Sequence, residues 1–250
     1  MRKIPILYFH SVSPSRNTDW YKSYLSVSTQ LFQAIVKYFQ RRGYAFLSLE
    51  ESLEQKHIAG KKVCFTFDDG YLDNFVHAFP VMREYGAKGT VFVSPSYVDP
   101  AEKPRFNAEK GGFLSWAEMR EMEKSGLIDI QSHTMTHSKV FSSSAIRDFH
   151  NPHADWLYPV TNRYPEKRPF YITDKTVKNL LPYGTPFFKE RSAVTTRRLS
   201  IEPSFEKYCV ETLTDCDWEN YSRESCFLKV NQRYSDLVKS QKLIQRIESE

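Results

Sequence analysis

The sequence predicts an α/β protein in which strands and helices alternate over the first 140 residues. The run Val63-Cys64-Phe65-Thr66-Phe67 is β-branched and aromatic, as expected of a buried strand. Apolar residues recur at helical spacing between positions 31 and 39, and Gly43 follows where such a helix would end. Repeated strand–helix units favour a parallel sheet, which on these patterns alone is either open or closed into a barrel.

The other elements of this half follow from similar signals. We predict strands at 4–9, 44–47, 62–67, 89–93 and 128–131, and helices at 31–39, 80–85 and 115–126. The last helix begins with a capping box formed by Ser115 and Glu118, and Gly86 and Gly126 follow the second and third helices. The active edge of such a sheet is the one where the parallel strands end.

Length and composition limit the class of protein. With 250 residues, 40% hydrophobic and 15% aromatic, the chain suits one sizeable domain or one domain with a large insertion. No run approaches the roughly 18 apolar residues of a spanning helix, and Met1 leads into a strand instead of a signal-peptide core. The four cysteines show neither C-x-x-C spacing nor a disulfide framework. We therefore expect a soluble protein with reduced thiols, located in the cytoplasm or at the inner face of the membrane.

Two short motifs place metal-ligating side chains after predicted strands. The first is Thr66-Phe67-Asp68-Asp69-Gly70, and the second is Ser132-His133-Thr134-Met135-Thr136-His137. Histidines four residues apart lie on one side of a turn, where they can bind one divalent metal together with a carboxylate. Adjacent aspartates on an extended chain point in opposite directions, so we expect one to ligate and the other to accept a proton. These residues predict a metal-dependent hydrolase.

Each motif also has a purely structural interpretation. Asp-Asp-Gly after a strand is common in turns, and an isolated H-x-x-x-H pair arises by chance. Their occurrence in order, each after a predicted strand, favours the metal site. His10, at the end of the first predicted strand, either lines that site or is a structural residue. Four further histidines have no partner at ligand spacing and are expected to be surface or packing residues: His57, His77, His150 and His153.

The two motifs resemble those of the polysaccharide deacetylases, carbohydrate esterase family four, also called the NodB-homology domain. The similarity runs from residue 3 to about residue 140, includes Pro5-Ile6-Leu7-Tyr8-Phe9-His10-Ser11-Val12, and is weak beyond. It implies an irregular (β/α) barrel, with Asp68 as the general base and Asp69, His133 and His137 as metal ligands. The cofactor implied is a divalent metal, with zinc first and cobalt, manganese or nickel as alternatives.

The resemblance implies a hydrolase that removes N-acetyl groups from amino sugars of a cell-surface polysaccharide or its lipid-linked precursor. Two alternatives remain open: a non-catalytic or truncated relative that binds metal and carbohydrate, and a hydrolase of the same fold acting on another non-peptide C–N bond. We cannot place the late histidine that serves the family as general acid. Leu181-Pro182-Tyr183-Gly184 resembles the family's Pro-Tyr-Gly element, so the Tyr183 N–H is a candidate oxyanion donor, with an ordinary turn as the alternative.

The pattern changes beyond residue 140. We expect three parts: 1–140 with the metal site, 141–220 as an irregular basic and aromatic-rich insertion, and 221–250 as an amphipathic helix. Residues 161–200 contain nine Lys or Arg and three Asp or Glu. They form either a solvated face or a patch for an anionic or lipid-linked substrate or an acidic membrane surface.

The last predicted helix runs to Glu250 without a stop signal, which suggests that the chain lacks the final strands of the barrel. A fragment of this kind would also lack the family's general acid. No motif of a nucleic-acid-binding module is present in the sequence.

Overall fold

The structure is a computed structural model, and it describes residues 4–14, 25–54, 60–107, 111–154, 157–164 and 175–246. The chain divides into two compact units, Met1–Thr136 and His137–Glu250. Among the described residues, no helix has the length and apolar character needed to cross a lipid bilayer.

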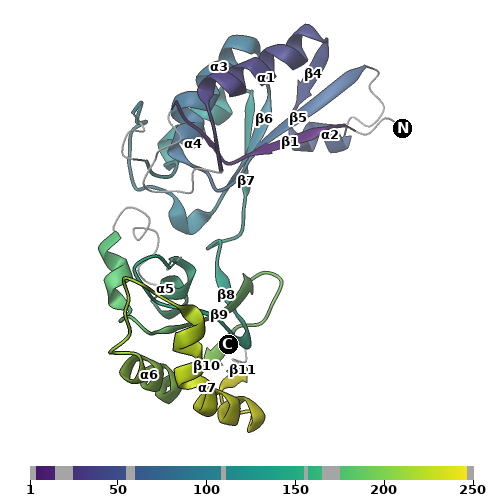
Figure 1. The fold of residues 1–250 in the computed structure, drawn as a ribbon. Coiled ribbons are helices and arrows are strands. Elements are labelled where there is room, and N and C mark those ends of the chain that lie inside the picture. The colour runs from purple at the N-terminus through teal and green to yellow at the C-terminus, as the bar shows by residue number, and fades with distance from the viewer. Residues whose placement is uncertain are drawn as a thin grey trace. The chain divides into compact units, whose positions relative to one another are not determined.

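The first unit is built on a five-stranded sheet in which every pairing is parallel (Figure 1). The path runs β1-β5-β6-β7, with β4 also paired to β5, so β5 is central. The α/β class and the parallel sheet are confirmed. β1 and β7 end this path, so no pair among the described strands closes a barrel. The strands are β1 (Ile6–Phe9), β4 (Tyr44–Leu47), β5 (Lys61–Phe67), β6 (Gly89–Val93) and β7 (Ile128–Ser132).

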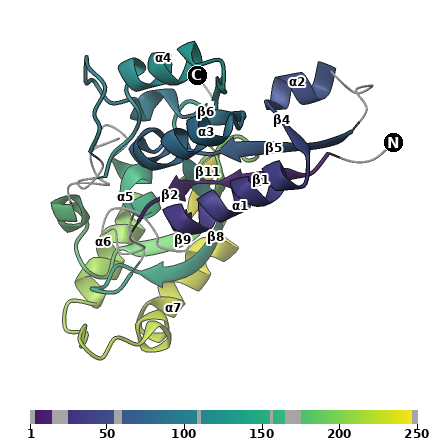
Figure 2. The ribbon, with the colours of Figure 1, turned by 90° about the horizontal axis from the view of Figure 1, so that it is seen from above.

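Helices α1 (Thr29–Arg41), α3 (Phe79–Tyr85) and α4 (Trp116–Lys124) contribute to the main core of this unit. Side chains alternate along β5, which directs Phe65 and Phe67 into that core. A shorter helix, α2 (Leu49–Glu54), lies beside β4 (Figure 2). β2 (Ser11–Val12) and β3 (Ser26–Val27) form a separate parallel pair just beyond the end of β1.

The predicted helix signals are found at the helix ends. Ser115 and Glu118 form the capping box of α4, and Gly86 ends α3 with a left-handed φ of 60°. Glu118 is fully buried, and it also accepts hydrogen bonds from Nε and Nη2 of Arg105 at 2.8 and 2.9 Å. The cap therefore also ties the loop around residue 105 to the helix.

The described residues of the second unit form antiparallel strand pairs and three α-helices. β8 (Lys139–Phe149) pairs with β9 (Pro186–Ser192), and β10 (Leu199–Ile201) pairs with β11 (Ile244–Arg246). The helices are α5 (Leu157–Arg163), α6 (Pro203–Thr212) and α7 (Arg223–Lys239). The prediction of an irregular insertion over 141–220 is wrong for much of its described part. The partners β8 and β9 are far apart in sequence, so local periodicity does not reveal their pairing.

The C-terminal helix is shorter than predicted. α7 ends at Lys239, and residues 244–246 form β11, so the prediction of a helix to Glu250 is wrong. Gln241 adopts a left-handed φ of 56°, and the N–H groups of Gln241 and Lys242 donate to the carbonyls of Val238 and Leu237. This is a Schellman cap with glutamine where glycine is usual, so no composition signal marked it.

Candidate metal centre

The first motif is located where β1 and β5 end together. Phe9 pairs with Phe67, and the Asp68 N–H donates to the Phe9 carbonyl at 2.9 Å, which extends the parallel ladder by one residue. Asp69 then takes a left-handed φ of 71° and is buried, whereas Asp68 is half-buried. The two adjacent aspartates therefore differ in backbone conformation and burial, which is consistent with one ligating a metal and the other accepting a proton.

Gly70 allows the turn after the two aspartates. Its φ is 70°, and a Cβ at this position would lie 2.7 Å from Cγ1 of Val93 on β6. The Gly70 carbonyl accepts from the Leu114 N–H at 2.8 Å, and the ring of Tyr71 stacks on Phe113. The turn is thus fixed on one side by β6 and on the other by residues 113 and 114.

The second motif continues from β7. The His133 N–H donates to the Val93 carbonyl at 2.7 Å, and the His133 carbonyl accepts from Oγ of Ser94 at 3.0 Å. The Met135 carbonyl accepts from the Ser96 N–H at 3.0 Å. The histidine loop is therefore fixed to the segment that follows β6, the same strand that contacts Gly70.

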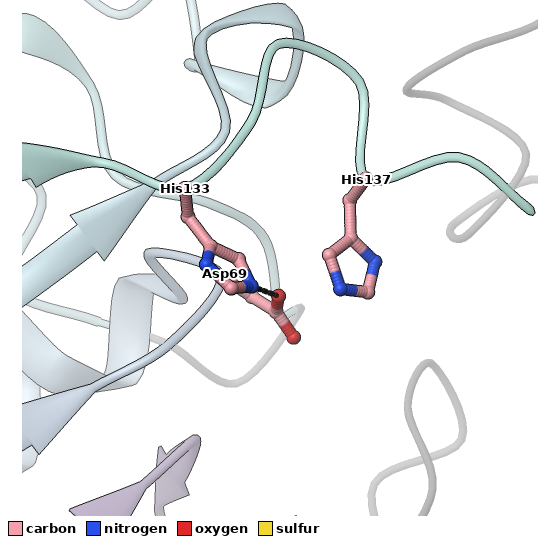
Figure 3. Close-up of side chains that lie close together, drawn as sticks. All are labelled: Asp69, His133 and His137. Atoms are coloured by element: carbon pink, nitrogen blue, oxygen red, sulfur yellow. Dashed lines mark ion pairs between the residues drawn. The ribbon is translucent and has the colours of Figure 1, made fainter. Parts of the chain in front are cut away.

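The structure brings together the three residues expected to be metal ligands. One ligand atom from each of Asp69, His133 and His137 lies within 4.8 Å of the other two (Figure 3). Nε2 of His133 is 3.5 Å from Oδ1 of Asp69. Two imidazole nitrogens and one carboxylate oxygen form a donor set that zinc accepts, with coordination positions left for water and substrate. The residues therefore fit a divalent metal.

Backbone strain is concentrated in the two motifs. Among the described residues other than glycine, four have a positive φ, and three of these are Asp69, Thr134 and His137, at 71°, 63° and 42°. Each such conformation costs of order 1 kcal/mol or more, and such residues cluster at functional sites. The hydrogen bonds at Gly70, His133 and Met135 hold this strained backbone in place.

A buried polar network beside the first motif was not predicted from the sequence. Asp73 is buried, and its carboxylate accepts hydrogen bonds from Oγ of Ser11 and Nδ2 of Asn74. The same Asn74 amide donates to the His10 carbonyl at 2.8 Å. The only signal for it was an Asp-Asn pair three residues after Gly70. The network joins the end of β1 to the turn that presents Asp68 and Asp69.

The two remaining predicted site residues lie in different units of the chain. His10 follows β1 at the edge where Asp68 and Asp69 lie, and its ring contacts Tyr8, but it is not part of the three-residue ligand group. Tyr183 lies in the second unit, where its ring packs on His150 and Trp218 at centroid distances of 5.2 and 5.5 Å. Substrate binding by either residue stays a prediction.

Some basic residues of the stretch 161–200 contact other residues of the protein. Arg163 pairs with Glu206 and stacks on Phe141, and Arg198 donates to the Asn162 carbonyl at 2.7 Å. Lys189, Arg191 and Arg197 are exposed, while Lys167 and Arg168 lie outside the described residues. Some basic residues of this stretch therefore make contacts within the protein, and the others remain candidates for binding an anionic ligand.

Residues 55–168 match the sequence model of the family described as polysaccharide deacetylase, and this stretch includes both motifs. This part of the chain is therefore similar to the polysaccharide deacetylase family, in agreement with the two motifs.

The chain is also similar to individual proteins named as deacetylases. A Bacillus subtilis (strain 168) protein, YxkH, named as a polysaccharide deacetylase, is 33% identical over 139 residues, which are 54% of this chain and 43% of YxkH. The poly-β-1,6-N-acetyl-D-glucosamine N-deacetylase of Escherichia coli (strain K12) is 29% identical over 44% of this chain and 18% of its own length. Among solved structures, the Streptococcus pyogenes deacetylase PplD in complex with acetate shows 25% identity and a TM-score of 0.46, covering 71% of this chain and 70% of PplD. The chain spans less than half the length of the two sequence relatives.

Proposed function

We propose that this protein is a metal-dependent N-deacetylase that hydrolyses the acetamide of N-acetylated amino sugars in a polysaccharide. The observation that carries the proposal is the group of Asp69, His133 and His137, with Asp68 immediately before the first ligand. The names of the relatives support the same reaction, and the E. coli enzyme suggests β-1,6-linked N-acetylglucosamine as the first substrate to test.

The chemistry divides between the ligands and Asp68. A divalent metal, when bound by Asp69, His133 and His137, lowers the pKa of a water molecule and polarises a carbonyl. Asp68 is half-buried at the strand end, and we propose that its carboxylate removes the proton from that water during attack on the acetamide carbon. Hydrolysis then releases acetate and the free amine, which must receive a proton before it departs.

Substrate and location extend the proposal beyond the reaction. We propose a cell-surface polysaccharide or its lipid-linked precursor as the substrate class, and zinc as the metal because two imidazoles and one carboxylate suit it. Cobalt, manganese or nickel would fill the same donor set. The proposed location is the cytoplasm or the inner face of the membrane, which cell fractionation with an antibody to the protein would test.

The decisive experiment measures metal content and deacetylation together. We expect the purified chain to release acetate from β-1,6-linked N-acetylglucosamine oligomers, to stop after chelation, and to recover when zinc is restored. Asp68→Asn should keep its metal and lose activity by roughly a hundredfold or more, whereas Asp69→Asn should lose the metal itself.

Two outcomes would contradict this assignment. Metal binding without acetate release by the unmodified chain would favour the non-catalytic relative. Loss of metal in Asp68→Asn but not in Asp69→Asn would show that the two aspartates have exchanged roles.

A further inference from the structure

Two of the four cysteines lie together in the second unit. Cys216 is in the turn that follows α6, and Cys226 is in the first turn of α7. Their sulfur atoms are 3.8 Å apart, and both residues are free thiols in the structure. The helices α6 and α7 that flank this pair contact one another (Figure 1). The sequence spacing of nine intervening residues gave no recognisable signal for the pair.

The two thiols have different environments. Cys226 is 2% exposed, and burial, followed by the neighbouring Cys216 sulfur, raises the pKa of its thiol to about 12. Cys216 is partly exposed, and Nζ of the exposed Lys229 lies 3.4 Å from its sulfur. The Lys229 ammonium also attracts an anionic reagent toward this sulfur. An external reagent therefore reaches Cys216 first.

We propose that Cys216 and Cys226 form an intramolecular disulfide when a small-molecule disulfide is present as oxidant. The Cys216 thiolate attacks one sulfur of the oxidant, which releases one reduced thiol and leaves a mixed disulfide on Cys216. Cys226 then loses its proton and attacks the Cys216 sulfur, which releases the second reduced thiol. Two protein thiols are oxidised and one small disulfide is reduced to two thiols, so atoms and electrons balance.

The new bond requires only a local movement. The sulfur atoms must approach from 3.8 Å to about 2.05 Å, and Cys216 lies in a turn outside the helices, where its backbone can adjust. The bond would fix the connection between α6 and α7 and restrict the unfolded chain. In an oxidising compartment the pair would be a disulfide, and in a reducing one a dithiol. The inference does not depend on the metal centre.

The test uses the full chain and oxidised glutathione under native conditions, followed by peptide mass spectrometry. We expect loss of two of the four thiols, a mass decrease of about 2 Da, and a single cross-linked product joining Cys216 to Cys226. Cys64 and Cys209 are buried and serve as internal controls that should stay reduced. Four persistent thiols, glutathione retained on Cys216 as the final product, or a bond between two chains would each overturn the proposal.

Variants test the order of attack. Cys226→Ser should stop at a stable glutathione adduct on Cys216, and Cys216→Ser should not react. Lys229→Gln should slow the reaction several-fold, whereas Lys239→Gln, on the exposed end of the same helix, should react at the original rate. Rapid adduct formation on Cys226 in Cys216→Ser would overturn the assignment of the attacking thiol.

Discussion

The two units of the chain differ in where they hold buried polar groups. In the first unit, buried Asp69, Asp73 and Asn74 gather where parallel strands end, within a few residues of strained backbone. In the second unit, the core consists of aliphatic, cysteine and aromatic side chains from an antiparallel strand pair and two helices, with Phe149, Phe188 and Phe205 fully buried. The candidate metal site therefore lies near the ends of parallel strands, and not in the basic stretch 161–200.

The largest expected effect is the loss of metal in His133→Ala. Removing one of three protein ligands should lower the metal content from about one equivalent to near zero, measured by inductively coupled plasma mass spectrometry. His153→Ala is the matched control, because His153 is exposed and lies outside the ligand group. An unchanged metal content in His133→Ala would remove the main difference between the two units.

The second prediction tests whether the two cores are independent. Phe65 and Phe188 are fully buried in separate clusters, so Phe65→Ala and Phe188→Ala should each cost about 3–5 kcal/mol. In differential scanning calorimetry we expect two transitions, with each variant lowering a different one. A single transition shifted equally by both variants would contradict independent cores.

The third prediction concerns the buried carboxylate of the first unit. Burial raises the pKa of Glu118, but the hydrogen bonds from Arg105 and Ser115 outweigh it and hold this pKa below 4.5. Because the pKa is lowered on folding, the stabilisation is present above the unfolded value and is lost as the pH falls through the folded value. Glu118→Gln should therefore cost about 2 kcal/mol at pH 7.

Urea denaturation of wild type and Glu118→Gln at pH 7 and at successively lower pH measures this effect. The difference between the two proteins should shrink as the pH falls below the unfolded value of 4.5. A difference that stays constant through the acid range would show that Glu118 contributes through shape and not through its charge.

The smallest effect is expected in the second unit. Tyr221 donates a hydrogen bond to Asp148, and burial, followed by this carboxylate, raises the pKa of its hydroxyl. Tyr221→Phe should cost about 1 kcal/mol, seen as a small fall in the urea midpoint of that unit. Tyr38→Phe is the control because the Tyr38 side chain on α1 is exposed, and an equal shift in both variants would exclude a specific contribution from the Asp148 contact.

The sequence by itself determined the local features of the first unit and the identity of the candidate metal ligands. The strand before Asp68, the capping box at Ser115 and the stop at Gly86 depend on residues close together in the chain, so periodicity and composition reveal them. The tertiary structure alone decided which distant groups meet. The hydrogen bond from Ser11 to Asp73 and the sulfur contact of Cys216 with Cys226 join residues whose spacing has no period.

The second unit shows the same division most clearly. The pairing of β8 with β9 and the Schellman cap at Gln241 depend on long-range strand contacts and on a backbone conformation unusual for glutamine. Neither leaves a pattern in the residues nearby. Side-chain spacing along the chain determines local structure. Contacts between distant segments are decided by packing, because the free energy of such a contact depends on the whole fold and not on the residues next to it in sequence.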